Sequence, residues 1–262
     1  MPVESETEPI PSVKDLASSE SSIRRACLQT ITTHLDERSP TNPLTPTQCL
    51  QLWKGLYVAL YMHDSKNAVS VQNLAAELAR TVRTVASKHL ELQSESANSD
   101  SWLASWTLAF WETICREWAS IDQWRMNKIL MLVRFVVRET FNLSLTTTVD
   151  DEEAGRSKSI ITSQTHILQA WPLSPRERKV PDGLRLHVLD IWVDELSGQV
   201  NAVQKSIDES GETEDAGVKT ALVNAAKSFM APVESLSKEA ISKGVKLRAK
   251  DAMKRSQELF SS

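Results

Sequence analysis

Apolar residues recur every three or four positions along most of this chain, which is the spacing of one face of an α-helix. The same spacing predicts helices over 13–36, 45–63, 68–90, 101–119, 123–143, 183–196, 218–231 and 235–260. Long alternations of apolar and polar residues, which are typical of strands, are few, and only seven glycines occur. The pattern therefore predicts an all-α protein.

Two sequence stretches mark where helices begin. Thr45 precedes Pro46, and Gln48 follows three residues after Thr45, which is the arrangement of a capping box with proline in the first turn. Ser120 and Gln123 have the same spacing and predict a tight turn before the long helix that follows. Asp182 is the expected cap of the helix over 183–196.

The spacing of the helices suggests a repeat architecture. Helix pairs follow one another roughly every 40–45 residues, which is the period of HEAT-like solenoids, although no residue-level repeat is visible. We therefore predict a HEAT-like α-solenoid array of about seven to nine helices with long acidic loops, and a closed helical bundle is the alternative.

Charge and composition divide the chain further. We predict a disordered N-terminus over 1–12, a helical-repeat part over 13–143, an irregular excursion over 144–181, and C-terminal helices over 182–262 with an acidic linker at 199–217. The residues from 13 to 262 are expected to form one continuous domain. The stretches 1–12, 144–160 and 199–217 together carry a charge of −9, so the rest carries +5 when the total is −4. A mildly basic body permits an RNA-binding surface.

Five of the eight tryptophans fall within 23 residues, from Trp102 to Trp124. This much aromatic bulk is typical of a helical core, and we expect Trp102, Trp106, Trp118 and Trp124 to be buried. The alternative is that one or two of them anchor a partner, since tryptophan is enriched at interfaces.

The charges in the same block predict ion pairs rather than catalysis. Glu112 and Arg116 lie one helical turn apart and attract each other. Arg134 and Arg138 have the same separation and repel each other, unless an acid from another helix lies between them. We therefore expect a structural ion-pair network between neighbouring helices.

Residue patterns typical of catalytic, cofactor-binding or metal sites are missing from the sequence. Cys27, Cys49 and Cys115 are isolated, which favours reduced thiols, and the five histidines are scattered without metal-ligand spacing. No glycine-rich phosphate loop or uninterrupted apolar run of about 18 residues occurs. The first twelve residues resemble neither a signal peptide nor a transit peptide. We expect no cofactor, no membrane contact and no small-molecule substrate.

Two basic clusters are candidate RNA-contacting surfaces, because lysines and arginines at helical spacing can follow a phosphate backbone without reading sequence. The alternative is an ordinary solvated helix face. The larger cluster lies near the C-terminus and the smaller one follows Pro175; their members are Lys238, Lys243, Lys246, Arg248, Lys250, Lys254 and Arg255, then Arg176, Arg178 and Lys179.

Four stretches, in order along the chain, carry a resemblance to a known family. They are Val13–Ala17 with Arg24–Ala26, Leu52–Leu56 with Met62–Asp64, the stretch Phe110–Phe141 (FWETICREWASIDQWRMNKILMLVRFVVRETF), and Gly183–His187 with Asp190, Ile191 and Asp194–Leu196. This set resembles the ribosomal RNA processing protein 1 family, also called the nucleolar protein 52 family. The signature positions are Trp53, Gly55, Phe110, Trp111, Arg116, Glu117, Trp118, Asp122, Arg125, Lys128, Arg134, Arg138, Phe141, His187, Asp190 and Asp194.

The resemblance implies a non-catalytic assembly factor of the nucleus and nucleolus. Its expected partners are the pre-60S particle (the precursor of the large ribosomal subunit), the large-subunit pre-rRNA, other nucleolar assembly factors and ribosomal proteins. In this interpretation the chain is a helical scaffold required for pre-rRNA processing. Two alternatives are a helical adaptor that binds only proteins and a nuclease acting on spacer RNA.

Overall fold

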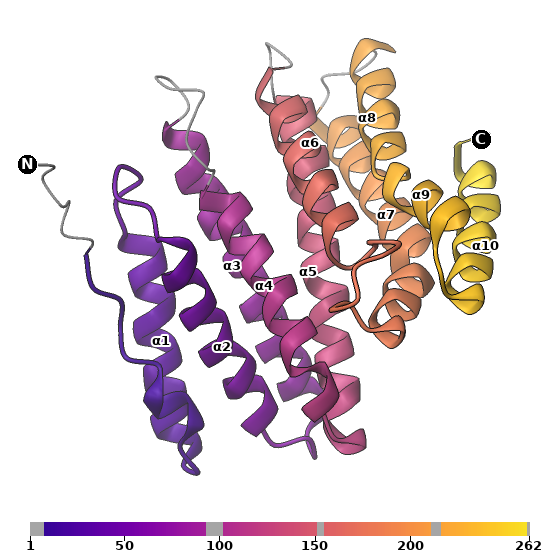
Figure 1. The fold of residues 1–262 in the computed structure, drawn as a ribbon. Helices are drawn as coiled ribbons and strands as arrows, with labels where there is room; N and C mark the ends of the chain where they lie inside the picture. Colours follow the sequence, from indigo (N-terminus) through magenta and orange to yellow (C-terminus); the bar gives the residue numbers. More distant parts are fainter. Residues whose placement is uncertain (1–7, 93–101, 151–154, 211–215, 261–262) are drawn as a thin grey trace, which may run out of the picture. The chain divides into compact units, whose positions relative to one another are not determined.

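The computed structural model describes residues 8–92, 102–150, 155–210 and 216–260. Over these residues it consists of ten α-helices and two 3-10 turns without a strand (Figure 1). The elements are η1 (Lys14–Ala17), α1 (Ser21–Glu37), α2 (Pro46–Met62), α3 (Ala68–Leu92), α4 (Trp102–Glu117), η2 (Trp118–Ser120), α5 (Gln123–Asp150), α6 (Gly155–Ala170), α7 (Asp182–Ser210), α8 (Ala216–Ser228), α9 (Ala231–Glu239) and α10 (Lys243–Phe260). The all-α prediction is confirmed.

The helices form two compact units. Unit 1 comprises residues 1–114 and 123–129, and unit 2 comprises 115–122 and 130–262. Within unit 1 the helices α1, α2 and α3 pack against one another, and within unit 2 α6 packs against α8 and α9, and α7 against α8 and α10. Packing between successive helices is the principle of α-solenoids. The HEAT-like array over the whole chain and the single domain over 13–262 stay predictions.

Aromatic side chains fill the core of unit 1. The ring centroid of Trp53 lies 5.0 Å from that of Trp106 and 4.9 Å from that of Phe110. Phe110 and Trp111 meet edge to face at 4.9 Å. Offset and edge-to-face pairs are the favourable geometries of aromatic rings, so the tryptophan-rich α4 anchors this core.

Gly55 allows the chain's first turn to pack against α2. A Cβ atom at this position would lie 2.7 Å from Val13 Cβ and 2.9 Å from Leu16 Cδ1, both of which are too close. The turn η1 therefore rests directly on the α2 backbone and buries Leu16. The sequence predicted one helix over 13–36, but this chain breaks after Ala17 so that η1 and α1 can both contact α2.

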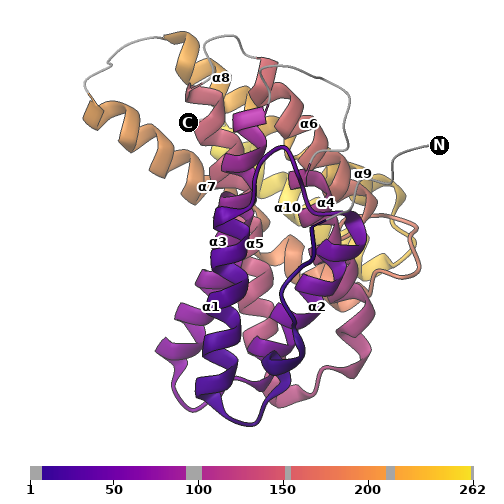
Figure 2. The same ribbon diagram turned by 90° about the vertical axis from the view of Figure 1, so that its left-hand side faces the viewer.

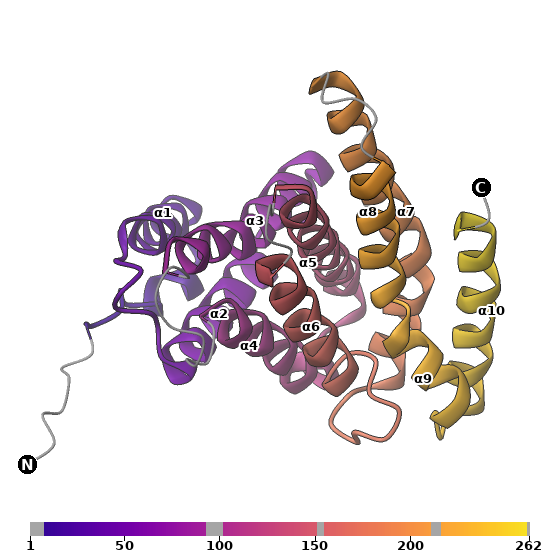
Figure 3. The same ribbon diagram turned by 90° about the horizontal axis from the view of Figure 1, so that it is seen from above.

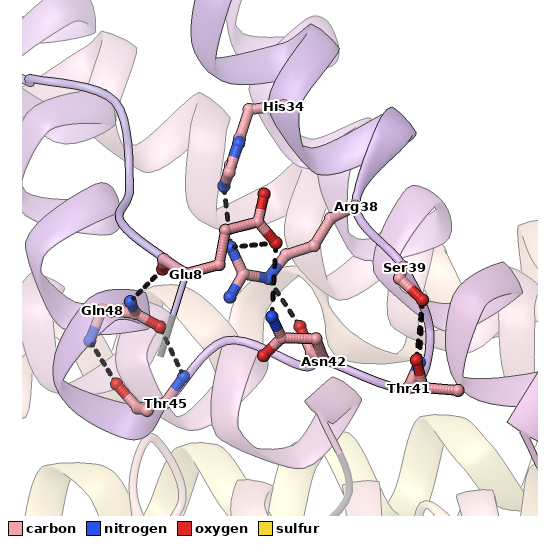
Figure 4. Close-up of polar contacts among 8 residues, drawn as sticks. All are labelled: Glu8, His34, Arg38, Ser39, Thr41, Asn42, Thr45 and Gln48. Atoms are coloured by element: carbon pink, nitrogen blue, oxygen red, sulfur yellow. Dashed lines mark hydrogen bonds and ion pairs between the residues drawn. The ribbon is translucent and has the colours of Figure 1, made fainter. Parts of the chain in front are cut away.

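The residues before η1 are ordered from Glu8 onward, so the predicted disorder over 1–12 is wrong for residues 8–12 (Figure 4). Glu8 accepts hydrogen bonds from Asn42 Nδ2 at 3.3 Å and, through its carbonyl, from Gln48 Nε2 at 3.0 Å. Its carboxylate also lies 3.8 Å from the buried guanidinium of Arg38. Residues 1–7 lie outside the described residues.

The two predicted capping boxes have different outcomes. At Thr45 the box is complete: its side chain accepts from Gln48 N, and Gln48 Oε1 accepts from Thr45 N. At Ser120 the prediction is wrong, because the hydroxyl donates to Glu117 O and α5 begins only at Gln123. The tight turn predicted there is present as η2.

The predicted irregular excursion over 144–181 is largely helical. Hydroxyls in the threonine-rich stretch donate to carbonyls four residues back, from Ser144 to Thr140 O and from Thr147 to Leu143 O, each at 2.8 Å. The helix α5 continues through this stretch to Asp150. The next helix, α6, buries one face that its sequence spaces by three and four residues: Ser157, Ile160, Ile161, Gln164, Ile167 and Leu168.

The predicted acidic linker over 199–217 is also mostly wrong. The helix α7 continues to Ser210, because Val203 and Ile207 extend its buried face, and α8 begins at Ala216. Residues 211–215 lie outside the described residues. Near the C-terminus the predicted helix over 235–260 is interrupted between Glu239 and Lys243, which separates α9 from α10.

Candidate nucleic-acid interface

The basic helix α10 packs along α7 in unit 2 (Figure 3). Val245, Ala249, Ala252 and Ser256 are buried, and their spacing of four, three and four residues places them on one face. Small side chains at three of these positions bring α10 close to its neighbours. Because this face of α10 is buried, the residues on the opposite face point to solvent.

Two arginines of α10 are paired with acids of α7. Arg248 Nη1 donates to Asp190 Oδ1, and Arg255 Nη2 donates to Asp194 Oδ1. The side chains in these pairs are 45–59% exposed, so each pair contributes little to stability. The pairs orient α10 on α7, and these two arginines are therefore already engaged by carboxylates.

The outward face of α10 carries three lysines and a leucine. Lys243, Leu247, Lys250 and Lys254 follow one another at four, three and four residues and are all exposed. Lys246 is half-buried at the edge of this face. None of these lysines forms a salt bridge with another residue in the described part of the chain. We call Lys243, Lys250 and Lys254 the lysine stripe.

The smaller cluster lies on the loop before α7, and a buried arginine holds this loop. Arg185 is 6% exposed and donates to Val180 O, to Glu177 O at 2.6 Å and to Ser174 O at 2.8 Å. Arg185 is not among the residues that the basic pattern predicts for the site. Its only sequence signal was its place within the Gly183–His187 stretch.

A groove of about 570 Å³ lies between the loop that carries the smaller cluster and the start of α10. Arg176 and Arg178 line it from the loop, and Ile241 and Ser242 line it from the junction of α9 and α10. Arg176 Nη2 lies 3.5 Å from a carboxylate oxygen of Glu239. The two predicted clusters are therefore neighbours, which their separation in sequence did not indicate.

The structure separates the ten candidate residues into paired and unpaired cations. Lys238 is bound to Glu234 one turn away on α9, so it joins Arg176, Arg248 and Arg255 in the paired group. The other six form no salt bridge with a described residue: Lys243, Lys246, Lys250, Lys254, Arg178 and Lys179. Five of these six are exposed, and they are the cations best placed to meet phosphate.

Two signature residues of α5 close the end of α2 in unit 1. Lys128 Nζ donates to Tyr61 O at 2.8 Å and to His63 O at 2.6 Å, and Arg125 Nε donates to Tyr61 O at 3.1 Å. The guanidinium of Arg125 also lies 4.7 Å from the centroid of the Tyr61 ring. Carbonyls at a helix end have no partner within the helix, so these cations act as a C-terminal cap.

An acid from another helix lies between Arg134 and Arg138, as the sequence required. Glu195 of α7 is 3% exposed and accepts from Arg134 Nε, and from Arg138 Nε at 2.7 Å. Burial acts to raise the pKa of this carboxyl, but the hydrogen bonds from Arg138 and Arg134 hold the pKa below its ordinary value. The predicted structural ion-pair network is confirmed here.

Three of the remaining signature residues, His187, Trp118 and Phe141, make contacts within unit 2. His187 Nε2 lies 3.0 Å from Leu130 O, and Trp118 packs against Gly183, where an added Cβ would lie 3.1 Å from its ring. Phe141 lies in the core of unit 2, where its ring meets Trp192 at 4.9 Å and Phe229 at 5.0 Å. Arg116 and Glu117 lie in the last turn of α4, and Asp122 directly precedes α5.

We predicted that Trp102, Trp106, Trp118 and Trp124 are all buried, and this prediction is wrong for Trp124. Trp102 and Trp106 are buried, Trp118 is half-buried, and Trp124 is 79% exposed at the start of α5. Helical spacing did not separate Trp124 from the core positions, because it lies in the first turn, before the buried face of α5 begins at Lys128.

The described residues offer little to metal or nucleophilic chemistry. No group of three or more His, Cys, Asp or Glu side chains that could hold a metal ion occurs among them. Burial raises the pKa of the Cys49 thiol to about 12, which suppresses its reactivity. None of the helices in the described ranges is long and apolar enough to cross a membrane.

Comparisons with known proteins identify relatives. A family model described as "Nucleolar protein, Nop52" matches residues 7–261. The chain is 30% identical over 185 residues to ribosomal RNA processing protein 1 homolog B of Homo sapiens, covering 70% of this chain and 21% of that protein. It is 26% identical over 198 residues to homolog A of Mus musculus, covering 74% and 35%. The homolog of Drosophila melanogaster is 29% identical over 166 residues, covering 62% and 21%.

The chain thus spans between about a fifth and a third of the length of these relatives. The matches confirm the resemblance that the four sequence stretches indicated.

Proposed function

Because the chain belongs to the nucleolar protein Nop52 family, we propose that it is a non-catalytic nucleolar factor that acts in pre-rRNA processing. In this proposal it joins the pre-60S particle and scaffolds the large-subunit pre-rRNA together with other assembly factors and ribosomal proteins. The names of the relatives, ribosomal RNA processing protein 1 homologs, support a role in rRNA processing. No cofactor or small-molecule substrate enters the proposal.

The observation that carries the RNA contact is the lysine stripe. Its three ammonium groups lie on the exposed face of α10, whereas the two arginines on the flank are bound to α7. An exposed lysine without a carboxylate partner can release counterions from a phosphate backbone on contact. Arg178 and Lys179, on the loop beside the groove, are two further exposed cations that form no salt bridge with a described residue.

A substitution series on α10 tests this contact. The triple variant Lys243→Gln, Lys250→Gln, Lys254→Gln removes the lysine stripe without touching the buried face or the arginine pairs. Its matched control removes three exposed lysines outside α10 that form no salt bridge with a described residue: Lys14, Lys66 and Lys158. Both variants change the net charge equally, so a difference between them reports position rather than total charge.

The expected result concerns the salt dependence of RNA binding. Each lost phosphate contact lowers the slope of log K against log salt by about 0.7 for single strands, so the triple variant is expected to lose a slope of about 2. The control is expected to keep the parent slope, and co-sedimentation with pre-60S particles should fall only for the stripe variant. Equal slopes in both variants would refute RNA contact by α10.

A second candidate function is a protein-only adaptor, favoured by two exposed apolar side chains, one just before α10 and one within it. Ile241 and Leu247 are 77% and 61% exposed, beside the groove and within the lysine stripe. Large exposed apolar side chains are candidates for contacts with a protein partner. The double variant Ile241→Ser, Leu247→Ser would lose particle association while keeping RNA affinity if this alternative holds.

A further inference from the structure

A second cavity lies in unit 1, away from the basic helix. It has a volume of about 500 Å³ and lies between α1, α2 and α3. Its lining comes from the part of unit 1 where α1 and α3 begin and α2 ends, which Figures 1 and 2 show as one end of this unit. Leu28, Ala59 and Leu74 are among its lining residues and are buried, so the cavity has an apolar floor.

Two arginines of α1 line one wall of the cavity. Arg24 Nη1 donates to Ser18 O at 2.7 Å and to Ser19 O at 2.9 Å, which fixes its guanidinium before any ligand arrives. Arg25 Nη1 pairs with Glu77 Oε2 at 2.5 Å across the cavity, and the Arg25 side chain is 61% exposed. A phosphate in the cavity would therefore have to take the place of the Glu77 carboxylate on Arg25, beside the guanidinium of Arg24 that the backbone holds in position.

His63 lines the cavity at the end of α2. Its Nε2 lies 2.9 Å from the hydroxyl of Ser70, another lining residue. Burial, followed by the charges of Lys128 and Arg24, lowers the pKa of His63. The imidazole is therefore neutral near pH 7, and it lies in a positive field that an anion in the cavity would offset.

The cavity has arginines on one wall and apolar side chains on its floor, so a fitting ligand needs both an anionic group and an apolar or aromatic part. Inorganic phosphate, or the phosphate of a modified protein side chain, would use the arginines but leave the floor at Leu28 and Leu74 uncovered. A nucleotide has both parts, and the volume lies within the range of about 300–1,000 Å³ that is typical of small-ligand pockets. Bases of single-stranded RNA are free to leave the stack and enter such a pocket.

We propose that this cavity binds one unstacked nucleotide of single-stranded RNA, with the base over the apolar floor and the phosphate at Arg24 and Arg25. Hydroxyl and amide groups of Ser70 and Asn73 face the sugar and base edges. The proposal rests on the proposed function in taking RNA as the source of the nucleotide. It adds a contact on unit 1 that is separate from the lysine stripe.

The test follows His63 by proton NMR in the full chain. The His63→Gln variant assigns its imidazole resonance among the five histidines of the protein. Adenosine 5′-monophosphate and a short single-stranded oligoribonucleotide are each titrated into the parent protein. Both are expected to shift the His63 resonance and to raise its pKa, with the oligonucleotide binding more tightly, because an anion favours the protonated imidazole.

The decisive variant is Arg25→Gln, with Arg80→Gln as its matched control. Arg80 is exposed on α3 one turn beyond Glu77 and does not line the cavity. Arg25→Gln is expected to weaken mononucleotide binding about tenfold, because it removes a charge-assisted contact and leaves the Glu77 carboxylate unpaired in the cavity, while Arg80→Gln leaves binding unchanged. Asn73→Trp, at an exposed position on the cavity wall, should block binding without removing a charge.

Several outcomes would overturn the proposal. These are an unshifted His63 resonance, equal weakening by Arg25→Gln and Arg80→Gln, unchanged binding in Asn73→Trp, or inorganic phosphate or a phosphoserine peptide competing as well as the mononucleotide. The lysine-stripe variant separates this inference from the proposed function. It should keep the His63 response to the mononucleotide, and a normal salt slope in that variant would refute the stripe alone.

Discussion

Removal of the Glu195 carboxylate should destabilise unit 2, because this single acid holds two arginines that otherwise repel each other. The test variant is Glu195→Gln, which keeps the shape of the side chain and loses its charge. Arg134 and Arg138 would then remain one helical turn apart without an acid between them.

The expected loss in the free energy of unfolding depends on how buried each partner of the ion pairs is. The Glu195 side chain is 4% exposed, whereas those of Arg134 and Arg138 are 45% and 40% exposed. A fully buried pair would cost about 3–5 kcal/mol to break, but the arginines can turn to water, so this range is an upper limit. Hydrogen bonds to charged groups contribute about 1.5–3 kcal/mol, and we expect a loss of roughly 2–3 kcal/mol.

The pH dependence gives a second, independent readout. Because the folded pKa of Glu195 lies below its ordinary value of 4.5, its contribution is complete above that value. It is lost as the pH falls through the lower folded pKa, where the carboxyl becomes protonated. The difference in stability between parent and variant should therefore be full near neutral pH and should close in acid.

Urea unfolding followed by circular dichroism measures both effects. The control is Glu234→Gln, which removes the exposed partner of Lys238 and should cost less than about 0.5 kcal/mol. The reasoning is refuted if Glu195→Gln is as stable as this control at neutral pH, or if its deficit is the same in acid.

Three further predictions concern packing. Gly55→Ala should destabilise the protein by about 1–3 kcal/mol, because the added methyl group overpacks the contact with η1. Gly198→Ala has open space around it and should stabilise the protein by roughly 0.5–1 kcal/mol. The midpoints of urea unfolding compare the two variants. Lys128→Met should cost about 1–3 kcal/mol, because His63 O loses its Lys128 donor while Tyr61 O keeps the bond from Arg125 Nε; faster amide exchange at the end of α2 would report this loss. Trp53→Ala should cost about 3–5 kcal/mol, whereas Trp124→Ala should stay within about 0.5 kcal/mol, and similar losses for both would contradict the assigned burial.

Local motifs could be predicted well from the sequence. The capping box at Thr45 depends only on residues within one turn, and it is present in the structure. The need for an acid between Arg134 and Arg138 follows from their spacing alone, and Glu195 meets it. The sequence could not say which acid this would be, because 57 residues separate Arg138 from Glu195.

The wrong predictions concern segments where the residue types suggest a loop but the structure has a buried helix, and side chains whose partners lie far away in the sequence. The run at 146–148 is threonine, a poor helix former, yet its hydroxyls bond to the preceding turn and the helix continues. In the candidate interface, the number of cations could be read from the sequence. Which of them pair with a carboxylate, as Arg248 and Arg255 do, could not be predicted. That pairing depends on Asp190 and Asp194, about 60 residues earlier in the chain.

The uneven burial of the tryptophans makes the protein a reporter of its own state. Trp53, Trp106, Trp111 and Trp192 are almost completely buried, whereas Trp124 is 79% exposed. A water-soluble collisional quencher such as iodide should therefore remove mainly the red-shifted emission of Trp124 from the folded protein. The quenched fraction, followed through a urea titration, would report the exposure of the buried rings as a group without any added label.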